Sequence, residues 1–447
     1  MDTKTTKEPR IKVGILQGRK EVRGCFNGRF LVHSNLNMNG TFCAKADGKH
    51  VVLLDASGKD VVRAEVIRCL SQDGSTFTLS DVTIGISFHW ERKQQQTFQS
   101  DMILIPCENE TLIAINEILL EDYLTSVVSS EMNASAPLEF LKAHAITSRS
   151  WLLAMLNRPR HLQSANQAMP SPIPEGDTFI HWYDRIDHTL FDVCADDHCQ
   201  RYQGISRLIS GNATKAVDAT RGILLTYNGA VCDARYHKAC GGLTENFENA
   251  WEDTPIPYLT AVSDSETPYP AIRSEDEAEK WIGFFPKVYC NINEREDLQH
   301  ILPAFDLETT DFFRWQVVYT HTEIEEILKE KSGIDFGRVF RLVPMERSQS
   351  GRIIRLKIEG SKRTITVGKE LEIRRWLSRS HLYSSAFVVS VTYDTTGLPS
   401  TFTLNGAGWG HGVGLCQIGA AVMATKGFSA EAILQHYFHG AELRKWY

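Results

Sequence analysis

Glu131 is the carboxylate that the chain places best for acid catalysis. It lies in the stretch from Val128 to Met155, VSSEMNASAPLEFLKAHAITSRSWLLAM, where we expect a short turn followed by an amphipathic helix. Ser135 is typical of a helix N-cap, and Pro137 suits the first turn. A glutamate there can donate a proton to a leaving group, provided that an apolar wall or a neighbouring negative charge raises its pKa.

The helix after Glu131 carries two cations on one stripe. Its apolar residues recur at spacings of three, four and seven, so one face packs inward: Leu138, Leu141, Ala145, Leu152 and Met155. Lys142 and Arg149 lie seven residues apart and share a second stripe. We expect this stripe to point both side chains toward whatever Glu131 binds. The alternative is a core helix preceded by an ordinary surface glutamate.

A Cys/His group further along the chain has the spacing of a metal site. In DHTLFDVCADDHCQRYQG, five residues separate His188 from Cys194, four separate Cys194 from Cys199, and His198 adjoins the last cysteine. Thiolates and imidazoles are the ligands that Zn²⁺ prefers, and the short spans let one loop surround the ion. We expect zinc on His188 and Cys194, completed by Cys199, His198 or both. An unligated loop or a Cys194 to Cys199 disulfide is the alternative.

Three blocks of the chain match the motifs of one family. The first contains Glu131, Met132, Pro137, Leu138, Glu139, Leu141, Lys142, Ala143, Ala145 and Arg149, with Ser150-Trp151 in place of the usual Thr-Tyr. The second is GILLTYNGAVCDARYHKACGGLTENFENAW, from Gly222 to Trp251, and the third is GWGHGVGLCQIGAAVMATKGFSAEAILQHYFHGAEL, from Gly408 to Leu443. In this order they resemble the sporulation stage II protein D family, whose relatives include the amidase enhancers. The resemblance extends from about Arg10 to the end of the chain.

The resemblance implies a lytic transglycosylase that cleaves the MurNAc-GlcNAc bond of peptidoglycan strands freed of peptide. Glycan cleavage commonly uses two carboxylates, but substrate-assisted routes need one. The family's catalytic glutamate falls on Glu131, which would protonate the glycosidic oxygen and then deprotonate the C6 hydroxyl to leave a 1,6-anhydro end. Lys142, Arg149, Tyr236 and Lys238 match positions that support catalysis in the family, by binding substrate or stabilising charge.

The resemblance also bears on the metal. Some family members carry a zinc-binding His-x5-Cys-x5-Cys at the place of His188, Cys194 and Cys199, although the second gap is one residue shorter here. Zinc would tie this loop beside the cleft, and with three protein ligands a fourth position stays open for water.

The glycine-rich segment from Gly408 to Gly414 predicts a tight turn. It lacks the Lys and Ser/Thr that follow the glycines of a P-loop, so nucleotide binding is not expected. We expect the turn to bring Trp409 and His411 to the floor of a cleft, where Trp409 can stack on a sugar ring and His411 can hydrogen-bond substrate or Glu131. A purely structural role for both is the alternative. Two short helices are expected after it, and Gln417 at their start is assigned to substrate binding.

The surrounding chain reads as an α+β fold. We expect a disordered N-terminus over residues 1–9, a β-rich domain over 10–110, the first part of the catalytic core over 111–263, an α+β excursion over 264–399 and the rest of the core over 400–447. The polar, proline-bearing segment from Arg158 to Gly176 predicts a mobile surface insertion.

Composition limits the partners. The 48 Lys and Arg residues against 55 Asp and Glu give a net charge of -7, so no broad basic field draws the chain to nucleic acid, whereas a neutral glycan needs none. The N-terminus has no apolar core of signal-peptide length, and no stretch reaches transmembrane length. This contrasts with the periplasmic or extracytoplasmic location that the family resemblance implies. The 10 cysteines are too sparse for a disulfide-stapled secreted fold.

Three other functions compete with glycan cleavage. A non-catalytic wall module can stimulate an N-acetylmuramoyl-L-alanine amidase, as the enhancer branch of the family is thought to do. A zinc hydrolase centred on Cys194 lacks an HExxH-like arrangement with its base. A nucleophilic Cys240 paired with His237 is disfavoured, because close neighbours in sequence are poorly placed to form a dyad.

Overall fold

A computed structural model describes residues 7–33, 36–86, 91–158, 176–182, 188–208, 210–292, 294–304 and 306–447. Most of the predicted insertion at 158–176 therefore lies outside the described residues, as do residues 1–6 of the predicted disordered N-terminus. Within residues 7–9, the Glu8 carboxylate accepts a hydrogen bond from the Glu121 amide, and the Pro9 carbonyl accepts one from Leu120. The fold is α+β, as the sequence predicted.

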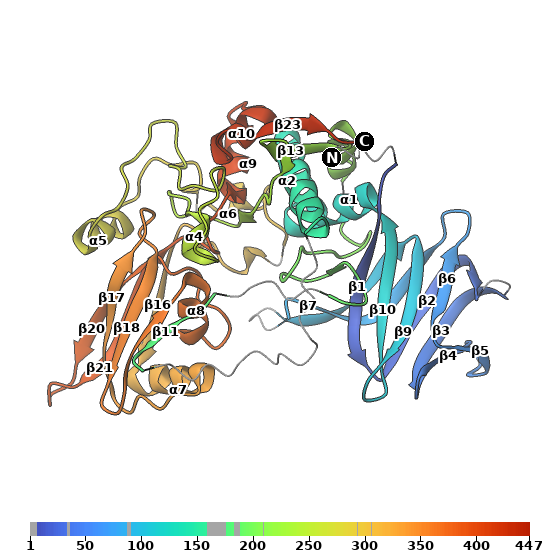
Figure 1. Cartoon of the computed structure of the whole chain (residues 1–447), viewed down its shortest axis with the longest axis horizontal. Coiled ribbons are helices and arrows are strands. Elements are labelled where there is room, and N and C mark those ends of the chain that lie inside the picture. The colour runs from blue at the N-terminus through green and yellow to red at the C-terminus, as the bar shows by residue number, and fades with distance from the viewer. Residues whose placement is uncertain are drawn as a thin grey trace.

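The N-terminal region forms a large, mostly antiparallel sheet (blue in Figure 1). Its first ten strands are β1 (Arg10–Arg19), β2 (Glu21–Val32), β3 (Leu36–Asp47), β4 (His50–Leu54), β5 (Asp60–Ala64), β6 (Ile67–Ser71), β7 (Thr76–Ile84), β8 (Arg92–Gln99), β9 (Asp101–Cys107) and β10 (Thr111–Leu119). The strand order is β12-β1-β10-β9-β6-β2-β3-β4-β5, with β7 between β2 and β8. The added strand β12 (Val193–Cys194) runs parallel to β1 and brings the Cys194 loop to this edge.

A helical layer follows the sheet and continues its apolar core. It contains α1 (Leu120–Glu131), α2 (Leu138–Leu156), α3 (Asn212–Ala219), α9 (Gln417–Thr425) and α10 (Ala430–Tyr437), with the small sheet β14 (Ala230–Val231), β13 (Ile223–Tyr227) and β23 (Glu442–Lys445). The central helix α2 contacts α1, α3, α9, α10 and β13, and most of its residues are buried. The two C-terminal helices that the sequence predicted thus pack on a helix more than 250 residues earlier in the chain.

Glu131 occupies a different local structure from the one predicted. It is the last residue of α1, not part of a turn, because the residues before it continue the helical hydrogen bonding as far as Met132, whose amide donates to the Val128 carbonyl. The turn that follows is organised by Asn133, whose side-chain oxygen accepts hydrogen bonds from the amide and hydroxyl of Ser135. The predicted N-cap role of Ser135 is therefore wrong, and α2 begins after Pro137 without a side-chain cap.

The excursion after residue 264 has its own apolar core around the fully buried Trp376. It contains α5 (Glu275–Gly283), α6 (Arg295–Leu298), the 3-10 turn η1 (Asp306–Glu308), β16 (Arg314–Thr320), α7 (His321–Ser332), β17 (Val339–Arg347), β18 (Ile353–Gly360), β19 (Thr364–Gly368), α8 (Glu370–Trp376), β20 (Phe387–Tyr393) and β21 (Pro399–Ala407). The sheets are β16-β21-β20 and β11-β19-β18-β17, the latter joined by β11 (Thr178–Ile180). Figure 1 shows the helical layer between this part (orange) and the N-terminal sheet.

Two short segments join the middle of the chain to its end. The strand β15 (Tyr236–His237) pairs in parallel with β22 (Leu415–Cys416), and Ala239 bridges to Trp409. Gly241 lets these backbones approach, because a Cβ there would lie 2.8 Å from the Gly408 nitrogen. The short helix α4 (Phe247–Ala250) follows this crossing. Among the described residues, no helix is both long and apolar enough to cross a membrane.

Candidate functional site

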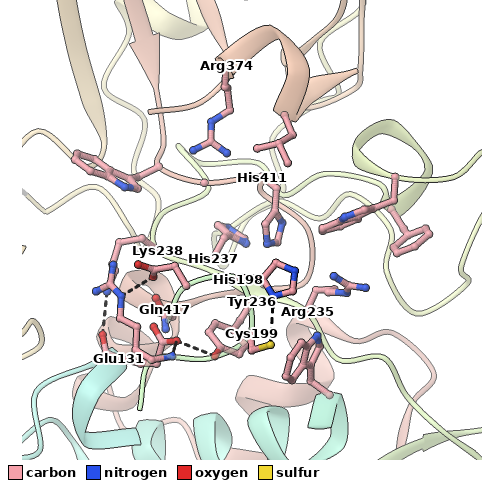
Figure 2. A pocket seen from close by; sticks show the side chains of 18 of the residues that line it. Glu131, His198, Cys199, Arg235, Tyr236, His237, Lys238, Arg374, His411 and Gln417 are labelled. Carbon is pink, nitrogen blue, oxygen red and sulfur yellow. Dashed lines mark hydrogen bonds and ion pairs between the residues drawn. The ribbon is translucent and has the colours of Figure 1, made fainter. Parts of the chain in front are cut away.

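A pocket of about 450 Å³ lies next to the paired strands β15 and β22 and beside the end of α1 (Figure 2). Six of the predicted catalytic and substrate-binding residues line it: Glu131, Tyr236, Lys238, Trp409, His411 and Gln417. His198 and Cys199 of the predicted metal group line the same pocket. The tertiary structure thus brings segments from four distant parts of the chain to one cavity.

Glu131 is nearly buried, with 7% of its surface exposed, and both hydrogen bonds to its carboxylate go to the same oxygen. The Tyr236 hydroxyl donates a hydrogen bond to Oε1 at 3.0 Å, and the Arg201 amide donates to the same atom at 3.0 Å. Burial, reinforced by the negative charge of Glu131, raises the pKa of Tyr236 well above its ordinary value. Tyr236 therefore stays protonated and remains a donor to Glu131 at any physiological pH.

A buried network of charges surrounds this carboxylate. The Lys238 ammonium donates to the Glu131 carbonyl at 3.0 Å and forms an ion pair with Asp306 at 2.8 Å. Arg201 pairs with Asp197 at 2.6 Å and with Asp306 at 3.3 Å. Burial opposes ionisation of Asp306, but Lys238 and Arg201 outweigh it and lower its pKa. Burial raises the pKa of Asp197, as do the negative charges of Glu131 and Asp306, while Arg201 opposes the rise.

The Cys/His group closes one side of the pocket. The donor atoms of His188, Cys194, His198 and Cys199 all lie within 4.8 Å of one another. Cys199 Sγ lies 3.4 Å from His188 Nε2 and 3.4 Å from His198 Nδ1. Hydrogen bonds from Cys199 and from both histidines lower the pKa of the Cys194 thiol to about 2, although burial acts in the opposite direction. Two cysteine sulfurs and two imidazole nitrogens this close together fit a divalent metal such as Zn²⁺.

Comparison with known proteins agrees with this arrangement. Residues 108–227, which include Glu131 and the Cys/His group, match the family described as Stage II sporulation protein. This stretch is similar to a stage II sporulation protein domain. This confirms the family resemblance of the three sequence blocks. Residues 245–414 match a domain of unknown function, DUF8618, which contributes Trp409 and His411. The pocket therefore lies where the sporulation domain meets the rest of the chain.

Characterised and uncharacterised relatives cover most of the chain. The stage II sporulation protein D of Bacillus subtilis is 25% identical over 354 residues, which span 78% of this chain and 82% of that protein. The amidase enhancer of Bacillus subtilis is 26% identical over 341 residues, or 72% of this chain and 40% of the enhancer. An uncharacterized protein of Brachyspira hyodysenteriae is 25% identical over 346 residues, covering 77% and 72% of the two chains.

Two of the predicted catalytic residues, Lys142 and Arg149, do not line the pocket. The expectation that Lys142 and Arg149 point toward Glu131 is wrong. Arg149 is fully buried and forms a two-pronged ion pair with Glu121, at 3.0 and 2.6 Å. Glu121 and Glu131 are ten positions apart in α1, which is about 15 Å along a helix axis. Lys142 pairs with Glu139, one turn earlier on the same helix, at 2.7 Å.

The residues of the third sequence block are fixed by their neighbours. His411 Nδ1 accepts a hydrogen bond from the Val413 amide at 3.0 Å, so the proton of the neutral ring resides on Nε2. Loss of solvent around the ring, with the nearby His237 and Arg235, lowers the pKa of His411 well below its ordinary value. Trp409 stacks on Tyr383 at 4.3 Å, which covers one face of its ring. Stacking of Trp409 on a sugar stays a prediction.

Gln417 has a defined partner beneath the pocket. Its amide nitrogen lies 3.0 Å from His144 Nε2. Burial, with a smaller effect of Lys238, lowers the pKa of His144 to about 3, so this ring is neutral and accepts the hydrogen bond. His144 in turn lies edge-on to Tyr236, with ring centroids 4.9 Å apart. Gln417 thus supports the tyrosine that contacts Glu131.

Sequence reasoning missed several residues of the site. Arg201 and Asp197 stand next to the predicted metal ligands, and this proximity was the one available signal. Asp306 lies in a 3-10 turn of the excursion with no motif around it. Arg235 and Arg374 also line the pocket, and Figure 2 shows Arg374 above His411. None of these residues lies in a segment whose periodicity points to a site.

Proposed function

We propose that this chain is a peptidoglycan lytic transglycosylase with Glu131 as its general acid and base. The observation that carries the proposal is the one-sided hydrogen bonding of Glu131. Among the described residues, Tyr236 and Arg201 both donate to Oε1, which leaves Oε2 to hold the proton that a glycosidic oxygen would receive. Similarity to a stage II sporulation protein D and to an amidase enhancer supports an action on the cell wall outside the cytoplasmic membrane.

The same geometry accounts for both halves of the reaction. Glu131 gives its proton to the leaving oxygen as the bond from the muramic C1 to that oxygen breaks. The Tyr236 hydroxyl then stabilises the carboxylate that results. In the second half, the C6 hydroxyl of the same sugar attacks C1 and returns its proton to Glu131. The internal hydroxyl outcompetes water because it is held close to C1.

The walls of the pocket suit a glycan strand without its peptides. Trp182, Trp251 and Trp409 offer aromatic surface to the apolar faces of sugar rings. Arg235 and Arg374 bring guanidinium groups to the pocket, which bind carboxylates well; Arg235 also pairs with Asp233 at 2.9 Å and Arg374 with Glu370 at 3.5 Å. A muramic acid whose lactyl group carries no peptide has a free carboxylate for them. This supports a preference for denuded strands.

Mass spectrometry of the products tests this function. Denuded glycan strands should yield fragments that end in 1,6-anhydro-muramic acid, and strands that keep their stem peptides should be cleaved more slowly. Reducing ends instead would mean that water attacks C1, and would require a second carboxylate such as Asp197 or Asp306, which both lie in the Glu131 network. That result would overturn the proposed mechanism.

Tyr236→Phe should lower turnover by about 10- to 100-fold. The change removes the hydroxyl that donates to Glu131 Oε1 and keeps the ring. A hydrogen bond to a charged group contributes about 1.5–3 kcal/mol, which corresponds to this range. Steady-state kinetics on denuded strands measures the loss. Tyr227→Phe, on β13 and outside the pocket lining, is the control and should keep full activity. Equal activity of both variants would exclude the role of Tyr236.

We further propose that the Cys/His group binds one zinc ion through His188, Cys194, His198 and Cys199. Bound there, zinc would supply structural anchoring of the loop. Arg201 follows Cys199 by two residues and contacts Glu131, so the loop positions the Arg201 amide and guanidinium. A His188→Ala, Cys199→Ser double variant should lose this zinc and at least about 10-fold in activity, as mutations that disturb metal-site support do. Zinc analysis and kinetics of the variant check both effects.

Stimulation of an amidase is the second candidate function. It is favoured by the similarity to an amidase enhancer over 72% of this chain. In this case a co-incubated N-acetylmuramoyl-L-alanine amidase releases more peptide in the presence of the protein, and the Glu131→Gln variant stimulates it equally. Stimulation without glycan fragments would select this function over cleavage.

A further inference from the structure

A second group of metal-ligand side chains lies in the interior, apart from the Cys/His group. Cys240, Asp264, Cys290 and Cys416 are all buried, and their donor atoms lie within 4.8 Å of one another. They come from four segments: the turn after β15, two loops of the central region, and the end of β22. We propose that these three thiolates and one carboxylate bind a second Zn²⁺.

The environment of Asp264 is the first argument. Its carboxylate is completely buried, and among the described residues no Lys, Arg or His forms an ion pair with it. Its two oxygens accept hydrogen bonds from the Tyr437 hydroxyl at 2.5 Å and from the Cys290 amide at 2.8 Å. A buried carboxylate is costly unless a cation balances it, and buried charges are commonly paired or bound to metal. The Tyr437 hydroxyl and the Cys290 amide hold the Asp264 carboxylate beside the three cysteine sulfurs, where it can serve as a metal ligand.

The spacing of the sulfur atoms is the second argument. Cys240 Sγ and Cys290 Sγ lie 3.5 Å apart. Two thiolates bound to one tetrahedral zinc at about 2.3 Å are separated by about 3.8 Å, whereas a disulfide needs about 2.05 Å. Backbone amides already point at the sulfurs, because the Cys240 amide donates to Cys416 Sγ and the Gly242 amide to Cys240 Sγ, each at 3.3 Å. Such donors stabilise thiolates.

The surroundings also fit an anionic, metal-bound cluster. Three thiolates, one carboxylate and Zn²⁺ leave two negative charges in the interior. Arg352 is buried and donates to the Cys240 carbonyl at 3.2 Å, and Arg314 donates to the Gly241 carbonyl at 3.1 Å. Both cations therefore face the turn that carries Cys240. Their charges offset the excess negative charge of the cluster.

The position of this site gives it a role in the pocket. Cys416 is paired in register with His237 across β15 and β22. Tyr236 and Lys238 flank His237, and both contact Glu131. Zinc at the second site would fix this strand pair, while zinc at the first site fixes the Arg201 loop. Glu131 would thus be held between two metal-anchored segments.

Metal analysis and zinc X-ray absorption of the unmodified protein test the proposal. Protein purified under reducing, chelator-free conditions should contain two zinc ions per chain. The average coordination should be two and a half sulfur ligands per zinc, because the first group offers two cysteines and the second three. One zinc with two sulfur and two nitrogen ligands would overturn the proposal. One zinc with three sulfur ligands would support it and reject zinc at the first group.

Variants separate the two sites. The His188→Ala, Cys199→Ser double variant should keep one zinc with three sulfur ligands, and Cys290→Ser should keep one with two. If Cys290→Ser does not fold, the number of sulfur ligands on the zinc that the double variant keeps still decides. Alkylation of unfolded wild-type protein that was purified without reductant tests separately for a disulfide. All 10 cysteines should be modified without prior reduction. A Cys240 to Cys290 disulfide, seen as two unmodified cysteines in peptide mapping, would contradict the metal site.

Discussion

Glu131→Gln should reduce glycan cleavage by about 10³- to 10⁴-fold. The amide keeps the size of the side chain and its capacity to accept hydrogen bonds from Tyr236 and Arg201, but it cannot donate an acidic proton. General acid-base catalysis contributes about 10²- to 10⁴-fold, and the upper part of this range applies because one group serves both halves of the reaction. Turnover of denuded strands, measured by fragment release, gives the loss.

The control for this variant is Glu139→Gln. Glu139 lies at the start of α2, pairs with Lys142 and does not line the pocket. The activity of the Glu139→Gln variant should therefore equal that of the wild type. Glycan binding should survive in Glu131→Gln, because the pocket walls are intact. Undiminished cleavage by Glu131→Gln would remove this residue from the mechanism.

Arg149→Met should lower the free energy of unfolding by about 3–5 kcal/mol. Removing one partner of a buried ion pair leaves the other charge uncompensated, and Glu121 is 3% exposed. Arg149 also donates to the Ile223 carbonyl at 3.1 Å, so the change loosens the contact between α2 and β13. Denaturant unfolding followed by circular dichroism measures the loss.

The matched change on the same helix is Lys142→Met. Its ion pair with Glu139 is partly exposed, and such pairs contribute about 0–1 kcal/mol. The free energy of unfolding of the Lys142→Met variant should therefore stay near that of the wild type. If Arg149→Met kept its stability and lost only turnover, Arg149 would act in catalysis, and its structural assignment would be wrong.

The elements of the fold follow closely from local sequence. The β-rich runs before residue 110 form strands, and the segments HTEIEEILKEKSG and RIIRLKIEG become α7 and β18. Their boundaries are marked by local chemistry. At α7, Thr320 and Glu323 form a capping box, and Gly333 ends the helix with a positive φ of 72°.

The sequence also singled out most of the motifs to which we assign chemistry. Glu131, the glycine-rich turn and the Cys/His group were proposed from residue types and spacing, whereas Tyr236 and Lys238 were proposed from the family resemblance. The short spacing of His188, Cys194, His198 and Cys199 made their convergence foreseeable, because one short loop holds all four. The first family block lies within the stretch that matches the Stage II sporulation protein family.

Only the tertiary structure decided which charged groups meet. Lys142 and Arg149 share a helical stripe, but α2 is surrounded on several sides, so each cation pairs with the nearest carboxylate. Asp306 reaches Lys238 from a turn 68 residues later. Cys240, Asp264, Cys290 and Cys416 span more than 170 residues. Helical periodicity and short spacing describe contacts within one segment, whereas these contacts depend on how separate segments pack against each other.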